Sequence, residues 1–146
     1  MAMVLNAMAV DPRRVWKGPW RWYHEDLLDC CVDLEKVKAE GISRGALSCL
    51  ALCNGLRPRI YCGSRSSVEE FRAVVQQAFQ EGEEEEEEEM KPLVVQYSRR
   101  VLGQTGAGHF SPLGGYCQER DMVLVLDVAR FKYPPYWVPL PLMWFV

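Results

Sequence analysis

The order of local patterns constrains the fold most, because helical signals fill the first half of the chain and extended signals fill the second. The clearest helix follows Ser66 and Ser67, where two overlapping Ser-x-x-Glu capping boxes precede apolar residues at helical spacing up to Phe79. Alternating or β-branched runs indicate strands at residues 93–97, 108–116 and 122–127. The sequence therefore predicts an α+β fold in which helices on the N-terminal side pack on an antiparallel sheet.

Four shorter helices are predicted before this point. The patterns place them at residues 2–9, 25–30, 34–40 and 43–53, with Ser43 as the cap of the last. Residues 57–62 look extended. The first helix begins at Met1 without a capping side chain, so we interpret it as the tail of a helix that starts upstream.

Composition limits the classes of partner. With 146 residues, 49% of them hydrophobic, the chain can bury one core, so a single domain is expected. A net charge of -3 offers no basic field for nucleic acid or for an anionic membrane. The apolar residues 1–10 are too few to span a bilayer, and they lack a basic flank. We expect a cytoplasmic protein, with residues 81–89 forming a solvated acidic loop.

The chain has six cysteines, and in a reducing compartment we expect thiols, small buried side chains or metal ligands sooner than disulfides. Cys49 and Cys53 are four residues apart on one predicted helix, a spacing that suits a shared soft metal and equally suits two core thiols. Nearby acidic residues and the end of a short helix should raise the pKa of Cys30 and Cys31, which makes them poor nucleophiles. The candidate metal ligands are thus Cys30, Cys31, Cys49 and Cys53, with core packing as the alternative.

His109 and Asp127 carry the clearest catalytic signal. Glycines precede the histidine, which lets a ligand or another backbone approach the imidazole, and the aspartate ends an apolar strand pattern. A histidine oriented by a carboxylate forms two parts of a cysteine-type triad, but no cysteine stands in a suitable position before them. A structural histidine is the alternative.

Several segments together closely resemble the catalytic domain of eukaryotic phytochelatin synthase. They are VLNA at 4–7, WKGPWRW at 16–22, LDCC at 28–31, GIS at 41–43, GAGHFSP at 106–112 and LDVARFKYPP at 126–135. The resemblance covers nearly the whole chain except the Glu run. It implies a papain-like cysteine-protease fold, with residues 1–146 as a partial catalytic domain cut at both ends and residues 81–89 as an inserted acidic loop.

The same resemblance implies a glutathione γ-glutamylcysteinyltransferase that makes phytochelatins for heavy-metal detoxification. Its nucleophilic cysteine, in a Tyr-Cys-Gly-type motif, would lie just upstream of Met1, so this chain alone is expected to be inactive. His109 would deprotonate that thiol, and Asp127 would fix the imidazole tautomer. The alternative is a non-catalytic thiol or metal-thiolate binding protein that retains the family surface.

The implied activity also indicates which molecules the chain would bind and which residues would bind them. Gly108, Arg130 and Tyr133 are the candidate residues for binding glutathione, since they flank the predicted pair and a cation suits the carboxylates of the peptide. A solvated turn is the alternative for the last two. No tightly bound cofactor is expected; cadmium, zinc or copper would enter as a glutathione thiolate substrate or as an activator. The tryptophans of residues 16–22 are expected to pack inside.

Overall fold

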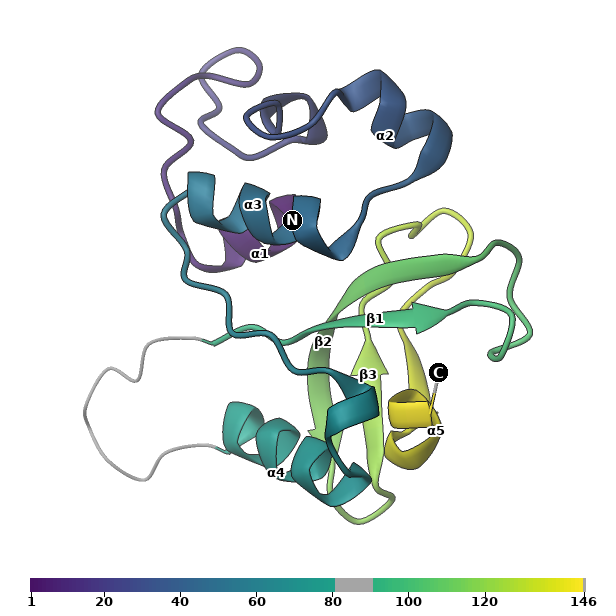
Figure 1. The fold of residues 1–146 in the computed structure, drawn as a ribbon. Helices are drawn as coiled ribbons and strands as arrows, with labels where there is room; N and C mark the ends of the chain where they lie inside the picture. Colours follow the sequence, from purple (N-terminus) through teal and green to yellow (C-terminus); the bar gives the residue numbers. More distant parts are fainter. Residues whose placement is uncertain (81–90, 146) are drawn as a thin grey trace. The chain divides into compact units, whose positions relative to one another are not determined.

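A computed structural model describes residues 1–80 and 91–145, so the predicted acidic loop at 81–89 lies outside the described residues. The chain divides into two compact units, residues 1–60 and residues 61–146, which we describe separately (Figure 1). Each unit has its own cluster of buried apolar side chains. The described buried residues thus form two clusters, where composition led us to expect one core.

The first unit is helical. Its elements are α1 (Ala2–Ala7), the 3-10 turn η1 (Glu25–Leu27), α2 (Leu34–Glu40) and α3 (Arg44–Cys53). The Ser43 hydroxyl accepts a hydrogen bond from the Ala46 amide, as its capping role predicts, and α2 ends at Gly41, whose φ of 83° suits glycine. The predicted helix at 25–30 is only one 3-10 turn long, and Asp29 beyond it forms an ion pair with Arg14.

The core of this unit surrounds Leu5, Tyr23, Leu28 and Leu50. Helix α1 has no side-chain cap, but Asn6 fixes it by exchanging two hydrogen bonds of 2.9 Å with the Tyr23 backbone. The Tyr23 hydroxyl then donates to Asn54 Oδ1 at 2.8 Å, just after α3. These polar contacts connect α1 and α3 across the apolar cluster.

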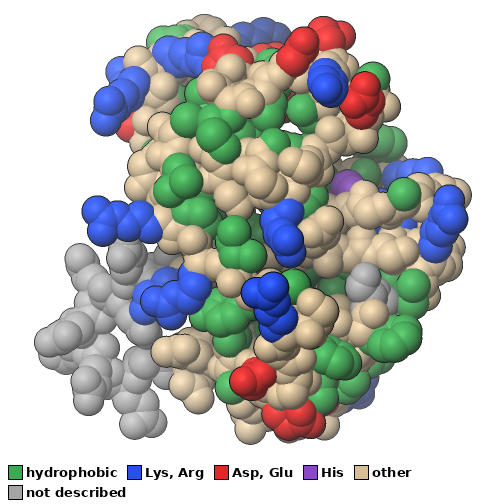
Figure 2. Space-filling view, viewed as in Figure 1, with side chains coloured by type: hydrophobic (Ala, Val, Ile, Leu, Met, Phe, Trp, Pro, Cys, Tyr) green, Lys and Arg blue, Asp and Glu red, His purple; other side chains and the backbone are tan. Residues whose placement is uncertain are grey.

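Contrary to the prediction, the tryptophans of residues 16–22 do not pack inside the protein. Trp20 is 67% exposed and Trp22 is 54% exposed. A tight turn, closed by the Trp16 amide donating to the Trp20 carbonyl at 2.9 Å, directs these rings away from the core, and Trp16 stacks on His24 instead. Hydrophobic side chains also reach the surface elsewhere on the face that Figure 2 shows.

The second unit contains a four-stranded antiparallel meander in the order β1-β2-β3-β4, with helices packed on it (Figure 1). Its elements are η2 (Gly63–Arg65), α4 (Val68–Phe79), β1 (Val94–Ser98), β2 (Gly108–Cys117), β3 (Met122–Val125), β4 (Tyr136–Pro139) and α5 (Leu140–Phe145). The predicted α+β class and the three predicted strands are confirmed. Strand β4 and helix α5 were not predicted from their short, Pro-rich sequence.

Helix α4 is held at both its start and its middle. The capping box forms as predicted, with Ser67 and Glu70 bonded to each other's backbone amides. Arg72 then forms a bidentate pair of hydrogen bonds, at 3.0 and 2.8 Å, with the carboxylate of Asp121 in the β2–β3 turn. Val75 on the same helix is fully buried in the core of the sheet. The helix therefore anchors the sheet whose edge positions the candidate site.

Strand β2 has a bulge where its pairing with β3 shifts between Leu113 and Gly115. The intervening Gly114 lies so close to Leu126 that a Cβ would fall 2.7 Å from that side chain. Leu126 in turn donates its amide to the Pro112 carbonyl at 2.9 Å. This close packing holds the chain that leads from β3 into Asp127.

No helix among the described residues is both long and apolar enough to cross a membrane.

Candidate active site

His109 and Asp127 meet at one end of the sheet. His109 is the second residue of β2, and Asp127 follows two residues after the end of β3. Nε2 of the imidazole lies 3.4 Å from Oδ1 of the carboxylate. The Asp127 side chain is fully buried, whereas 24% of the His109 side chain remains exposed. A buried acid therefore stands behind a histidine that solvent can reach.

Asp127 is held on its Oδ1 side by a cation and by its own turn. Nη2 of Arg99 lies 2.7 Å from Oδ1, and the Ala129 amide donates to the same oxygen at 2.9 Å. Burial alone would raise the pKa of this carboxyl, but the hydrogen bond and charge of Arg99, with the Ala129 amide, leave the pKa below its ordinary value. Asp127 is thus a carboxylate at neutral pH.

The second oxygen of Asp127 faces two tyrosine hydroxyls. Tyr97 and Tyr136 donate to Oδ2 at 3.2 and 3.3 Å, and the two hydroxyls lie 3.0 Å apart. The Tyr97 hydroxyl is also 3.2 Å from the buried hydroxyl of Ser111. Burial raises the pKa of Tyr97 strongly, so its phenol stays protonated. This network fixes the carboxylate in one orientation.

His109 is neutral in this setting. Burial lowers its pKa, and the positive charge of Arg99 adds to the effect against the opposing influence of Asp127. The ring lies edge-on to Tyr97, its partner across β1 and β2, with centroids 5.8 Å apart. Nε2 is buried and has no hydrogen-bond partner among residues 1–80 and 91–145 that meets strict geometry. With Nε2 directed toward Asp127, Nδ1 is the nitrogen left to take a proton.

The three candidate glutathione-binding residues have different surroundings. Gly108 helps to line a shallow depression formed with Gln96, Tyr97 and Ser98, and a Cβ on Gly108 would meet open space. Tyr133 packs its ring under the guanidinium of Arg99, 4.8 Å from the centroid, and its hydroxyl accepts a hydrogen bond from the Thr105 amide. Arg130 is exposed and forms no ion pair within the described part of the chain.

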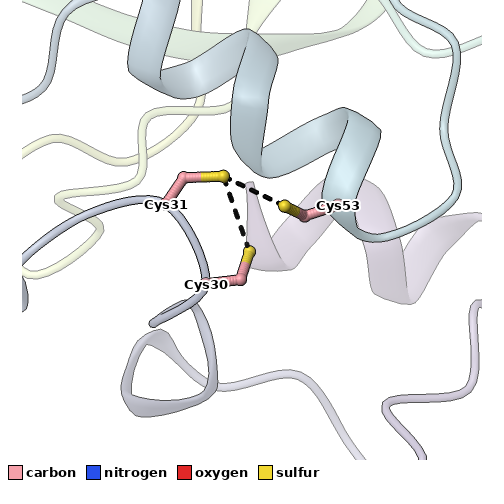
Figure 3. A group of neighbouring side chains, drawn as sticks. All are labelled: Cys30, Cys31 and Cys53. Atoms are coloured by element: carbon pink, nitrogen blue, oxygen red, sulfur yellow. Dashed lines mark hydrogen bonds between the residues drawn. The ribbon is translucent and has the colours of Figure 1, made fainter.

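The four candidate metal ligands lie together in the first unit. Figure 3 shows Cys30 and Cys31 on the loop after η1 and Cys53 on α3, with their sulfurs directed toward one another. Cys49, one turn before Cys53, forms a disulfide with Cys31, so the expectation of thiols, buried side chains or metal ligands sooner than disulfides is wrong for this pair. Core packing is also wrong for Cys30, Cys49 and Cys53, which are all exposed: Cys30 lies on the loop after η1, and Cys49 and Cys53 lie on α3.

The pKa of Cys30 is raised, in the predicted direction, but chiefly for a different reason. Although the residue is exposed, partial desolvation of its sulfur comes first, the neighbouring Cys53 second, and Asp29 contributes less. Within the second unit, Cys117 ends β2 at the opposite end from His109, about 26 Å along an extended strand. Among the described residues of that unit, Cys117 is therefore not placed to act with His109.

Three residues of the site had no sequence signal of their own. Arg99, Tyr97 and Tyr136 surround Asp127, yet they come from the end of β1 and from the unpredicted β4. Strands at 93–97 and 108–116 were predicted, but not their pairing; the observed antiparallel register of β1 and β2 sets Tyr97 opposite His109. Only tertiary structure brings the arginine into the same cluster.

A neutral, partly exposed imidazole with a buried carboxylate behind it is typical of the base and orienting acid in enzymes that transfer acyl groups through a nucleophile. Comparison with known proteins agrees with this class. The sequence profile described as phytochelatin synthase matches residues 1–145. The chain belongs to the phytochelatin synthase family.

Individual relatives are similar over 144 residues, 99% of this chain. The chain is 51% identical to glutathione gamma-glutamylcysteinyltransferase 3 of Lotus japonicus and 51% identical to glutathione gamma-glutamylcysteinyltransferase 1 of Arabidopsis thaliana. It is 46% identical to the glutathione gamma-glutamylcysteinyltransferase of Schizosaccharomyces pombe. It covers 29%, 28% and 33% of the length of these three relatives, in that order.

Proposed function

We propose that this chain is part of the catalytic domain of a cytoplasmic, papain-like glutathione γ-glutamylcysteinyltransferase. The observation that carries the proposal is the 3.4 Å approach of His109 Nε2 to the buried carboxylate of Asp127. The names of the relatives supply the substrate, because each is called a glutathione gamma-glutamylcysteinyltransferase. Glutathione and its γ-glutamylcysteine oligomers are then the substrates and products.

The proposed nucleophile is a cysteine outside this sequence, in a segment that precedes residue 1. His109 accepts the proton of its thiol at Nδ1, and Asp127 stabilises the resulting imidazolium through Nε2. The thiolate attacks the carbonyl of the Cys-Gly bond of glutathione. His109 returns the proton to the departing amine, so glycine leaves and a γ-glutamylcysteinyl thioester forms.

The second half of the reaction regenerates the thiol. The free amine of another glutathione, or of a growing phytochelatin, attacks the thioester carbonyl after losing a proton to His109. The acyl group moves to that amine, and the cysteine sulfur leaves as a thiolate. The depressed pKa of His109 keeps its neutral form available as the base for both steps.

Binding of the glutathione carboxylates is proposed for the residues around the pair. The open surface at Gly108 leaves room for a substrate backbone beside His109. Tyr133 lies against Arg99, whose charge is already paired with Asp127. Tyr133 therefore contributes to glutathione binding by its shape and by hydrogen bonding. Arg130, exposed and three residues after Asp127, supplies the cation. A heavy-metal ion such as cadmium, zinc or copper would enter as a glutathione thiolate or as an activator.

Steady-state turnover tests the proposal. A chain preceded by the corresponding N-terminal segment of the Arabidopsis relative is incubated with glutathione and cadmium, and γ-glutamylcysteine oligomers are measured. We expect turnover that His109→Ala lowers by about 10²- to 10⁴-fold, the usual contribution of a general base. His24→Ala, at the only other histidine of the chain, is the matched control and should leave turnover unchanged. Equal rates for both variants would contradict the proposal.

A second candidate is a non-catalytic metal-thiolate protein, and the grouping of four cysteines in the first unit favours it. The two candidates differ in one respect that can be measured. With the N-terminal segment of the Arabidopsis relative added, the second candidate predicts no release of glycine from glutathione, whereas the transferase predicts continuous release.

A further inference from the structure

Tyr136, the first residue of β4, places its hydroxyl beside the carboxylate of Asp127. The hydroxyl oxygen lies 3.3 Å from Asp127 Oδ2, 3.0 Å from the Tyr97 hydroxyl and 3.4 Å from Gln104 Oε1. The backbone of Tyr136 pairs with that of Val125 across β4 and β3, two residues before the carboxylate. Through this contact, β4 reaches the candidate active site.

The hydroxyl protons around Asp127 can be assigned from the acceptors that surround them. A tyrosine hydroxyl has one proton to donate, and an ionised carboxylate is a stronger acceptor than an amide or another hydroxyl. Gln104 Oε1 already accepts a hydrogen bond from Arg99 Nη1 at 2.7 Å. Tyr136 therefore donates to Oδ2 of Asp127, and Tyr97 donates to the same oxygen at 3.2 Å. Both tyrosine protons are thus directed at one carboxylate oxygen.

Donors on Oδ2 affect His109 through the carboxylate. They fix the plane of the carboxylate, so that Oδ1 is the oxygen 3.4 Å from His109 Nε2. Each donated hydrogen also offsets part of the negative charge that the imidazole experiences, and a weaker negative charge favours the neutral ring. Among residues 1–80 and 91–145, Tyr136 has no hydrogen bond or ring contact with His109 itself. Its influence on the imidazole therefore passes through Asp127.

The other charged groups near His109 come from the end of β1 and from the turn that follows Asp127. Arg99 lowers the pKa of His109, and Asp127 raises it. Behind Arg99, the ring of Tyr133 lies 4.8 Å from the guanidinium and 5.5 Å from Lys132 Nζ. With these cations in place, the tyrosine hydroxyls determine how much of the carboxylate charge acts on the imidazole.

We propose that Tyr136 is a positioning residue for the base, acting on His109 through the hydrogen bond that it donates to Asp127. The bond holds Oδ1 toward the imidazole and reduces the charge that the carboxylate presents to it. The base then stays neutral until it accepts a proton, while Asp127 continues to orient it. The role in the reaction rests on the proposed transferase function, but the effect of Tyr136 on His109 can be measured without turnover.

Proton NMR titration of the 146-residue chain measures this effect. The chain has two histidines, and His24, in residues 1–60, gives the internal reference signal. We expect Tyr136→Phe to raise the pH at which His109 titrates by about 0.5–1 pH unit, because its carboxylate partner loses a donor. The His24 signal should be the same in every variant. An unchanged titration of His109 in Tyr136→Phe would overturn the proposal.

Tyr116→Phe is the matched control. The Tyr116 hydroxyl donates to the carboxylate of Asp121 at 2.8 Å, so this replacement removes a bond of the same kind near the other end of β2. His109 should titrate in Tyr116→Phe as it does in the unchanged chain. Equal shifts in the two variants would show that loosening of the sheet moves the titration, and this result would also overturn the proposal.

A nearly isosteric replacement provides the test if Tyr136→Phe does not fold. Site-specific 3-fluorotyrosine at position 136 keeps the ring and the hydroxyl, and its more acidic phenol is a stronger hydrogen-bond donor. We expect His109 to titrate at a lower pH than in the unchanged chain, the opposite direction to Tyr136→Phe. A shift to higher pH, or no shift, would overturn the proposal.

Turnover separates this inference from the transferase proposal. With the N-terminal segment of the Arabidopsis relative added, the acidic limb of the pH–rate profile should move to higher pH in Tyr136→Phe and stay in place in Tyr116→Phe. Absence of glycine release from every chain would contradict the transferase, and the NMR titration would still decide the effect of Tyr136 on His109. Glycine release with an unmoved acidic limb in Tyr136→Phe would overturn the positioning role alone.

Discussion

Arg99 and Asp127 form a buried ion pair, with Nη2 2.7 Å from Oδ1 and side chains that are 6% and 0% exposed. This contact is shorter than the 3.4 Å approach of His109 to the same oxygen. The arginine therefore compensates the buried charge, and the histidine shares a carboxylate that is already fixed. The orientation of the proposed base depends on a residue that does not touch it.

Removing that cation should destabilise the second unit. Arg99→Ala leaves the Asp127 carboxylate buried without its charged partner, which lowers the free energy of unfolding by about 3–5 kcal/mol. Urea unfolding followed by far-ultraviolet circular dichroism measures the change. Arg100→Ala, at the exposed next residue, is the matched control and should stay near the stability of the unchanged chain. Similar effects at both positions would contradict the proposed role of the pair.

Stability should fall as the pH drops below 6.5. The pKa of His109 is lowered from 6.5 in the folded chain, so between the two pKa values the unfolded chain binds a proton that the folded chain does not. The contribution is complete above 6.5 and is lost as the pH falls through this interval. Asp127, whose pKa is also lowered, adds a further loss below its ordinary 3.8.

Unfolding free energies measured along a pH series check this expectation. His109→Gln should remove the decline that begins below pH 6.5 and leave the more acidic decline due to Asp127. The same replacement at His24 is the control and should keep the first decline. If stability were constant between neutral pH and the acidic range, His109 would not be held in its neutral form.

The tyrosine hydroxyls around Asp127 should contribute modestly to the free energy of unfolding. Tyr97→Phe removes the hydroxyl that donates to Asp127 Oδ2 and shares a hydrogen bond with the Ser111 hydroxyl, at a cost of about 1 kcal/mol in unfolding free energy. Tyr61→Phe, at a ring that is 55% exposed, should have almost no effect. Thermal melts of the two variants provide the comparison, and a neutral Tyr97→Phe would show that Tyr136 and Arg99 alone satisfy the carboxylate.

Two adjacent glycines of β2 should respond differently to alanine. A Cβ at Gly114 would lie 2.7 Å from Leu126, whereas one at Gly115 would meet neighbours at 3.9 Å. We expect Gly114→Ala to lower the unfolding free energy by about 1–3 kcal/mol, as overpacking does. Gly115→Ala is the control. A Gly114→Ala chain as stable as its control would mean that Leu126 moves away freely.

Local signals in the sequence were sufficient to predict much of the fold. The Ser67–Glu70 capping box and the alternation in β2 both depend on neighbouring residues, and both were predicted correctly. Strand β4 was missed because Pro134 and Pro135 precede it and Pro139 ends it, so it lacks an alternating run. Its edge position in the sheet is fixed by pairing with β3, which is a tertiary effect.

The candidate site was predictable only in part for the same reason. His109 and Asp127 carry recognisable neighbours along the chain, whereas Arg99 is distinguished only by the carboxylate that folding brings to it. The cysteines show the opposite case. Their spacing suggested a common site, but exposure of α3 and the Cys31–Cys49 bond could not be predicted from composition.

The central claim is that His109 and Asp127 activate a cysteine that takes an acyl group from glutathione. Rapid-quench measurement of glycine release, on the chain preceded by the N-terminal segment of the Arabidopsis relative, tests it most directly. We predict a burst of about one glycine per chain at the first turnover, the mark of an acyl-enzyme. The burst should disappear in His109→Ala and slow strongly in Asp127→Asn, with His24→Ala unchanged. A burst of undiminished rate in His109→Ala would contradict the account.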